Sequence, residues 1–275
     1  MRDFLKKSRR IVIKAGTSIL TTDGHISEKN MERLAAEITP LLRSGRQVVL
    51  VSSGAIAFGM ETLGQKKRPK EMPRLQACAA IGQGKMMHAY ARVFSKKGID
   101  TAQLLLTRDG LEIRPRFLAA RRTLEELFKM KALPIVNEND TIATEEIAFG
   151  DNDILSVHAA HLVRADLLVI LSDVDGFYLK DGSRIRGVYS EKEIDTELVR
   201  HLKDTRKQKT VGGMRAKLKA AKVAMRLGVP LLIVNGHKEG IIQDVLEGRD
   251  EGTLFKAGAA HKSDRQKWMA AWSKA

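Results

Sequence analysis

The chain has 275 residues, of which 43% are hydrophobic and 29% charged, and it carries a formal net charge of +15. This composition is too apolar for a disordered protein, and the length allows one large domain or two modest ones. Its single cysteine, Cys78, excludes an intramolecular disulfide and a paired-cysteine metal site, and we expect it in the core. The basic N-terminus lacks the pattern of a signal peptide, and no segment is apolar enough to span a membrane. We therefore expect a cytoplasmic protein with no membrane partner.

The positive charge leaves two interpretations open. A sequence pI near 9.9 is typical of proteins that bind nucleic acid or another polyanion. The alternative is a soluble enzyme with a lysine-rich surface. The high apolar content favours the enzyme, so we expect no specific nucleic-acid partner.

Short β-branched runs alternate with longer helical patterns along the chain. The expected strands lie in residues 10–16, 46–55, 101–107, 132–140, 165–176 and 229–236. The expected helices lie in residues 27–43, 72–98 and 212–228. Nearly continuous apolar strands separated by helices predict an α/β fold, with a parallel sheet covered on both faces. Ligands of such sheets bind at the strand ends, which is where the polar motifs of this sequence lie.

Two segments with glycine and lysine were compared with phosphate-binding motifs. "AAIGQGKMM" at 79–87 fails as a P-loop, since Met86 stands where a serine or threonine must bind magnesium, so we expect a helix there. "KAGTS" places Lys14, Gly16 and two hydroxyls at one strand end. This is either an anion cradle or an ordinary surface charge.

A second basic cluster lies far along the chain. Residues 200–226 contain ten lysines and arginines and a single acid, Asp204. Its centre, "VGGMRAK", places two glycines at an expected helix start and Lys217 one turn later, where both could face phosphates. A solvated helix face and a weak RNA patch are the open alternatives.

The stretch "NENDTIATEEIAFGDND" at 137–153 holds six carboxylates and no lysine or arginine. A metal site, a solvated acidic loop and a pocket for a cationic group are all compatible with it. An EF-hand counted from Asp151 fails, because Leu155 and Ser156 occupy the fifth and sixth positions. His158 and His161 are more typical of ordinary helix residues than of ligands, so we expect no metal site built by the protein.

Ten motifs, taken together and in order, resemble the amino acid kinase superfamily and, within it, the glutamate 5-kinase family. They are "IVIKAGTSIL", "VVLVSSGAIAFG", "AAIGQ", "LLLTRDG", "RFLAARRT", "PIVNENDTIAT", "GDNDILS", "SDVDGFY", "GGMRAK" and "GTLF". The combination of "NEND" with "GDND" is more specific than any single phosphate loop. The resemblance implies a three-layer αβα sandwich with a mainly parallel sheet, an N-terminal lobe (about 1–164) for the amino acid and a C-terminal lobe (about 165–275) for ATP.

The resemblance also assigns roles to individual residues. Lys14 and Lys217 would stabilise the transferring phosphoryl group from opposite sides, and Asp153 would hold both ammonium groups in position. The residues implied in glutamate binding are Ser53, Gly54, Asn137, Asp140 and Asn152. Those implied at the ATP site are Lys14, Gly16, Ser172, Asp173, Gly212, Gly213, Met214 and Lys217.

These residue types suit direct transfer of a phosphoryl group from ATP to the side-chain carboxylate of L-glutamate, the first step of proline biosynthesis. A carboxylate needs no general base, so positioning and charge neutralisation are what the site must supply. We see no Ser/His or Cys/His pair of the kind that forms a covalent intermediate, which favours direct transfer. We expect Mg²⁺ to be carried by the nucleotide, with mostly water ligands.

The sequence departs from the resemblance in two places. Val211 and Ala216 stand where the family usually has threonines, which removes two hydroxyls from the nucleotide loop. Only about twenty residues follow "GTLF", so we expect no C-terminal PUA domain. The resemblance further implies a dimer or tetramer and feedback inhibition by proline. A kinase of the same fold acting on another acid or on a phosphate monoester, and a basic RNA-binding protein, are the alternatives.

Overall fold

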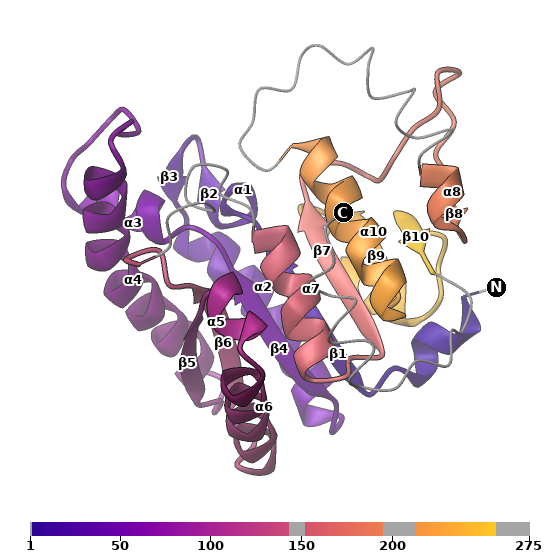
Figure 1. Ribbon diagram of the computed structural model, residues 1–275, viewed down its shortest axis with the longest axis horizontal. Coiled ribbons are helices and arrows are strands. Elements are labelled where there is room, and N and C mark those ends of the chain that lie inside the picture. Colours follow the sequence, from indigo (N-terminus) through magenta and orange to yellow (C-terminus); the bar gives the residue numbers. More distant parts are fainter. Residues whose placement is uncertain (1, 143–151, 195–212, 257–275) are drawn as a thin grey trace.

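The computed structural model describes residues 2–142, 152–194 and 213–256. Most of the strands in these residues form one large sheet (Figure 1). Its order is β5-β6-β4-β1-β7-β9-β10-β8, and a separate hairpin pairs β2 with β3. The strands are β1 (Arg10–Ala15), β2 (Thr21–Thr22), β3 (His25–Ile26), β4 (Gln47–Ser52), β5 (Thr101–Leu106), β6 (Leu133–Glu138), β7 (Leu167–Ser172), β8 (Gly187–Val188), β9 (Leu231–Asn235) and β10 (Thr253–Phe255). Each of the six predicted strands is present. Among the described strands of the large sheet, only the pairing of β10 with β9 is antiparallel, so the prediction of a mainly parallel sheet is confirmed.

The helices follow the strands in the predicted alternation. They are η1 (Asp3–Lys7), α1 (Thr17–Leu20), α2 (Glu28–Arg43), α3 (Ala55–Thr62), α4 (Met72–Ser95), α5 (Arg108–Glu112), α6 (Arg114–Lys129), α7 (Asn152–Leu162), α8 (Glu191–Glu193), α10 (Met214–Leu227) and α11 (Ile241–Leu246). Ser27, where the predicted helix 27–43 begins, caps α2 by accepting a hydrogen bond from the main-chain amide of Asn30 at 3.3 Å. Residues 79–87 lie inside α4, which confirms that this segment is a helix and not a P-loop.

The strands of the sheet are apolar on both faces, and each face has its own helical layer. In β1, Ile11 and Ile13 join a core with α2, α4 and α11, whereas Val12 joins a second core with α6, α7 and α10. In Figure 1, α7 and α10 cross in front of the sheet and α2 lies behind it. The three-layer αβα sandwich is therefore confirmed, and Cys78 is buried where α3 packs on α4.

One strand differs from its prediction. The run at 101–107 predicts a buried strand, but β5 lies at the edge of the sheet, and Leu105 is 39% exposed. An edge strand has only one neighbouring strand and an incompletely covered face. A short apolar run does not distinguish an edge position from a central one, so the expected burial of this strand was wrong.

The centre of the sheet places strands from distant parts of the chain side by side. β1 lies between β4 and β7, and Ala15 at its end pairs in register with Ser52 and Leu171. The predicted lobe boundary near Arg164 falls in the turn between α7 and β7. Because these strands are parallel, the loops after β1, β4, β6 and β7 lie together along their carboxyl ends.

In the described part of the chain, the structure holds no helix with the length and apolar character needed to cross a bilayer.

Candidate active site

Three charged side chains from separate elements meet at the carboxyl ends of the central strands. The ammonium of Lys14 lies 2.6 Å from one carboxylate oxygen of Asp153, and that of Lys217 lies 3.4 Å from the other. Asp153 is fully buried, while Lys14 and Lys217 are 7% and 9% exposed. We call these three residues the buried triad. The structure thus brings together the three side chains predicted to handle the phosphoryl group.

Each member of the buried triad is held by its own element. Lys14 is the penultimate residue of β1 and Asp153 lies in the first turn of α7, where the helix dipole favours a carboxylate. Lys217 lies one turn into α10, whose N-cap is Gly213. Helix α7 packs against both β1 and α10. The triad geometry therefore depends on the packing of two helices against one central strand.

The buried triad carries a net positive charge at a site that is shielded from solvent. Burial alone would raise the pKa of Asp153, but Lys14 and Lys217 outweigh it and hold the pKa below its usual value. Two ammonium groups share one carboxylate, so the three side chains sum to one excess positive charge. Buried charge of this kind favours an anionic ligand such as a phosphoryl group.

Polar side chains adjoin the buried triad on the N-terminal side. The side-chain nitrogen Nδ2 of Asn152 lies 2.8 Å from Asn137 Oδ1, 3.1 Å from Ser53 Oγ and 2.9 Å from the main-chain carbonyl oxygen of Ser52. Asn137 is the penultimate residue of β6, Ser53 follows β4, and Asn152 directly precedes Asp153 in the chain. Three residues predicted to bind the amino acid are therefore in direct contact.

Two further predicted residues lie on the turns beside this group. Gly54 has φ 117° and begins α3, a backbone conformation that strains any residue with a Cβ. Asp140 lies in the turn that follows β6, and burial raises its pKa to about 6, with the attraction of Arg68 offsetting part of the effect. A partly buried carboxylate that has lost some of its hydration gains from an ammonium partner, because the positive charge favours its ionised form.

The described residues predicted for the nucleotide lie at the ends of three elements: after β1, at the end of β7 and at the start of α10. Ser172 ends β7 and donates from Oγ to Asp173 Oδ1 at 3.1 Å, and Asp173 itself is exposed. Gly16 caps α1, and a Cβ there would lie 3.4 Å from the ammonium of Lys14. Gly213 and Met214 form the start of α10, whose free amides are suited to bind phosphate. Gly212, Val211 and residues 143–151 of the acidic stretch lie outside the described residues.

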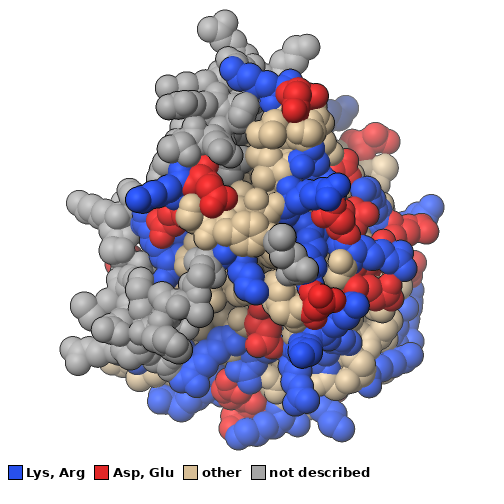
Figure 2. Space-filling model, turned by 90° about the vertical axis from the view of Figure 1, so that its right-hand side faces the viewer, with Lys and Arg blue, Asp and Glu red and all other residues tan. Residues whose placement is uncertain are grey.

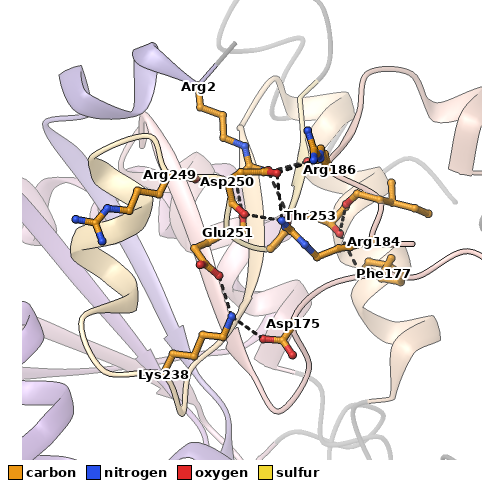
Figure 3. A network of polar contacts seen from close by, with 12 residues as sticks. Arg2, Asp175, Phe177, Arg184, Arg186, Lys238, Arg249, Asp250, Glu251 and Thr253 are labelled. Atoms are coloured by element: carbon orange, nitrogen blue, oxygen red, sulfur yellow. Dashed lines mark hydrogen bonds and ion pairs between the residues drawn. The ribbon is translucent and has the colours of Figure 1, made fainter. Parts of the chain in front are cut away.

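The loop after β7 is fixed by a second group of charges, which we call the exposed network (Figure 3). Lys238 pairs with Asp175 at 2.9 Å and with Glu251 at 3.0 Å. Asp250 pairs with three arginines from two segments, at 3.0 to 3.3 Å: Arg2, Arg184 and Arg186. The exposed network ties the loop that carries Asp173 to the loop after β9 and to the N-terminal segment.

The described residues contain no group of three or more histidines, cysteines, aspartates or glutamates that could hold a metal ion. The right-hand end of the molecule in Figure 1 faces the viewer in Figure 2. Figure 2 shows lysines and arginines over much of this end, with aspartates and glutamates between them.

Comparison with known proteins adds the family. A model of the amino acid kinase family matches residues 9–235. The chain is 46% identical to the glutamate 5-kinase of Geobacter metallireducens, over 97% of this chain and 72% of the relative. It is 41% identical to a glutamate 5-kinase of Thermus thermophilus, over 95% of this chain and 71% of the relative. This chain belongs to the glutamate 5-kinase family of amino acid kinases.

Solved structures agree with the amino acid kinase fold. The carbamate kinase of Giardia lamblia, bound to AMP-PNP, matches with a TM-score of 0.65 over 92% of this chain and 100% of that chain. The UMP kinase of Bacillus anthracis matches with a TM-score of 0.61, over 92% of this chain and 97% of that chain. Both are 18% identical to this chain, so they support the fold alone.

One contact of the candidate site was absent from the sequence predictions. Gln83 of α4 accepts a hydrogen bond at 2.7 Å from the amide nitrogen of Asn137. The motif "AAIGQ" contains this residue, but in the sequence it reads only as part of an apolar helix. A polar residue that directly follows Gly82 was the one available signal, because a glycine inside a helix often marks a close approach.

Proposed function

We propose that this protein transfers the γ-phosphoryl group of ATP to the side-chain carboxylate of L-glutamate and so forms L-glutamyl 5-phosphate, the first step of proline biosynthesis. The observation that carries the proposal is the buried triad. Its three side chains lie between the amides of Asn137 and Asn152 on one side and the start of α10 on the other. Membership of the glutamate 5-kinase family supports glutamate as the acceptor and ATP as the donor.

The chemistry asks for charge neutralisation more than for proton transfer. A glutamate side chain with a pKa near ~4.3 is ionised at neutral pH, so the acceptor needs no general base. One carboxylate oxygen attacks the γ-phosphorus while the bond from that phosphorus to the bridging β-γ oxygen breaks, and ADP leaves with the electron pair. The negative charge spreads over the equatorial oxygens of the transferring group. Lys14 and Lys217 stabilise this charge, and Asp153 keeps their ammonium groups in place.

The remaining predicted residues position the two substrates. Ser53, Gly54, Asn137 and Asn152 hold the acceptor, and Asp140 binds its ammonium group. Gly16, Ser172, Asp173, Gly213 and Met214 line the ATP side in this proposal, together with Gly212. Because the acceptor is fixed in line with ATP, transfer is direct and forms no phosphoenzyme.

Three further parts of the proposal come from the family resemblance. Mg²⁺ enters on the phosphates of ATP, since it prefers phosphate oxygens and water as ligands. The protein is a cytoplasmic homo-oligomer, a dimer or tetramer, which light scattering measures. Proline inhibits it, which a titration of the initial rate with proline measures.

The proposal is tested by incubating the protein with ATP, Mg²⁺ and a candidate acceptor, and by trapping any acyl phosphate with hydroxylamine. We expect a hydroxamate that depends on L-glutamate. Transfer to another acid or to UMP, with none to glutamate, would replace it with the alternative kinase activity. A phosphoenzyme trapped in the absence of glutamate would contradict direct transfer.

A further inference from the structure

The hydrogen-bonded amides beside the buried triad end at Gln83. From Asn152 they run to Asn137 and then to Gln83, through contacts of 2.8 Å and 2.7 Å. Asn152 adjoins Asp153 of the buried triad in the chain. Gln83 is therefore the member of this group that is separated from the triad by the largest number of hydrogen-bonded side chains.

The direction of every hydrogen bond in this group is fixed by one main-chain carbonyl. The side-chain nitrogen of Asn152 lies 2.9 Å from the carbonyl oxygen of Ser52, which can only accept. The same nitrogen donates to Asn137 Oδ1, so the nitrogen of Asn137 must face Gln83. Gln83 consequently uses its oxygen to accept, and its own NH₂ group points elsewhere.

That NH₂ group is the unusual feature. Gln83 Nε2 is buried, and within the described residues it has no hydrogen-bond partner. A buried donor without an acceptor is unfavourable, and native proteins rarely contain one without a functional reason. The direction fixed above also excludes relief by exchanging the two ends of the amide. An acceptor on a ligand would satisfy it.

The backbone around Gln83 is fixed against the start of α3. A Cβ at Gly82 would lie 1.8 Å from the main-chain oxygen of Ala55, and one at Gly59 would lie 1.8 Å from that of Cys78. Helices α3 and α4 are therefore in backbone contact at these glycines. Ala55 directly follows Gly54 of the predicted acceptor site, so Gln83 is held beside it.

We propose that Gln83 donates its side-chain amide to the α-carboxylate of the acceptor and thereby selects α-amino acids. This inference rests on the proposed function, which places the side-chain carboxylate at the lysines and the α-carbon at the far end. Of the two groups on that carbon, only the carboxylate accepts hydrogen bonds, whereas the ammonium is a donor suited to Asp140. Gln83 and Asp140 together would recognise both charges of the amino acid.

The test compares acceptors that differ only at the α-carbon. L-isoglutamine replaces the α-carboxylate with a carboxamide, and 4-aminobutyrate lacks the group entirely, while both retain the reactive carboxylate. Initial rates are measured by hydroxylamine trapping for the wild-type protein and for Gln83→Glu. This substitution retains an oxygen for Asn137 and replaces the free donor with an acceptor.

For Gln83→Glu we expect kcat/KM for glutamate to fall by about hundredfold or more, with the KM for ATP unchanged. The preference for glutamate over isoglutamine should fall by at least about tenfold, because a carboxylate at position 83 accepts from a carboxamide and repels a carboxylate. Gln83→Met, which has neither donor nor acceptor, should reduce the same preference. Lys85→Gln is the matched control, since it makes the same change of charge two residues along α4 at an exposed position, and it should leave both ratios within about twofold.

The possible failures are distinguishable. A wild-type protein that makes no hydroxamate from glutamate would overturn the proposed function and the role of Gln83 with it. A wild-type protein that is active on glutamate, with an unchanged preference over isoglutamine in both position-83 variants, would overturn the role of Gln83 alone. A purely structural role would lower the rate with every acceptor equally and leave that preference intact.

Discussion

The protein contains two groups of ion pairs that differ chiefly in burial. In the buried triad, one carboxylate serves Lys14 and Lys217, and all three side chains are at most 11% exposed. In the exposed network, Asp250 serves three arginines and its side chain is 43% exposed. The distances of the two groups overlap, so geometry alone does not separate a chemical role from a structural one.

The difference lies in what water does to each group. Solvent reaches Asp250 and screens its pairs in the exposed network, and Arg2, whose side chain is only 10% exposed, also donates to main-chain carbonyls, so the loss of one pair costs little. The buried triad is largely shielded from solvent, and its three side chains together carry one positive charge in excess, which favours an anion. Burial therefore makes one group suited to phosphoryl transfer and leaves the other to hold loops together. Five predictions test this comparison.

Replacing Asp153 should have the largest effect. In Asp153→Asn the two buried ammonium groups lose their counter-charge, so we expect the free energy of unfolding to fall by about 3–5 kcal/mol. Turnover should fall by about hundredfold or more, because the lysines are no longer held. Urea unfolding and the hydroxamate assay measure the two effects. A free energy of unfolding within about 1 kcal/mol of wild type would show that the two lysines do not need the Asp153 carboxylate as a counter-charge.

Removing one cation should affect turnover more than stability. Lys217→Met is expected to lower kcat by about hundredfold, since a preorganised charge at the transferring group is lost. The KM for glutamate should change little, because the proposed function assigns Lys217 of α10 to the nucleotide side of the site. Lys219→Met is the control, as it removes the same charge from an exposed position of α10. Near-normal kcat in Lys217→Met would disprove its role.

A pair of glycines in α4 extends the contrast from charge to packing. Gly82→Ala forces a Cβ against the backbone of α3, so we expect a loss of about 1–3 kcal/mol in the free energy of unfolding. Gly84 is exposed, and a Cβ added there would meet no atom within 4 Å, so Gly84→Ala should instead stabilise by about 0.5–1 kcal/mol. Thermal or urea unfolding of both variants measures this, and equal effects would contradict the close contact.

The pH dependence of glutamate binding tests Asp140. Its pKa is raised to about 6, so the carboxylate is charged above that pH and takes up a proton as the pH falls through it. The ammonium of glutamate loses its partner on protonation, so the KM for glutamate should be constant above about pH 7 and rise up to about tenfold per unit below pH 6. Asp140→Asn should have a high KM with no such dependence. A flat profile in the wild-type protein would contradict the assignment.

The smallest effect is expected in the exposed network. Asp250→Asn should lower the free energy of unfolding by less than about 1 kcal/mol, because its pairs are screened by water. Turnover should stay within about twofold of wild type. If Asp250→Asn impaired turnover as strongly as Asp153→Asn, burial would not be what separates the two groups.

Much of the fold was readable from the sequence because its signals are local. Apolar β-branched runs predicted all six of the longer strands, and Ser27 predicted the start of α2. Strands β8 and β10 have only two and three residues, too short for a periodic pattern. The exposure of β5 was missed for a different reason, since an edge position depends on where the other strands lie.

The candidate site divides in the same way. The sequence by itself determined which residues carry suitable chemistry: Lys14 after an apolar run, Asp153 in "GDND" and Lys217 after two glycines. Only the tertiary structure decided that Lys14 and Lys217 share the buried carboxylate of Asp153, that Asn137 and Asn152 are hydrogen-bonded, and that Gln83 is left with a buried donor. The physical reason is that residue type and backbone propensity are properties of neighbours in the chain. Distance, burial and the direction of a hydrogen bond arise only when remote segments pack together.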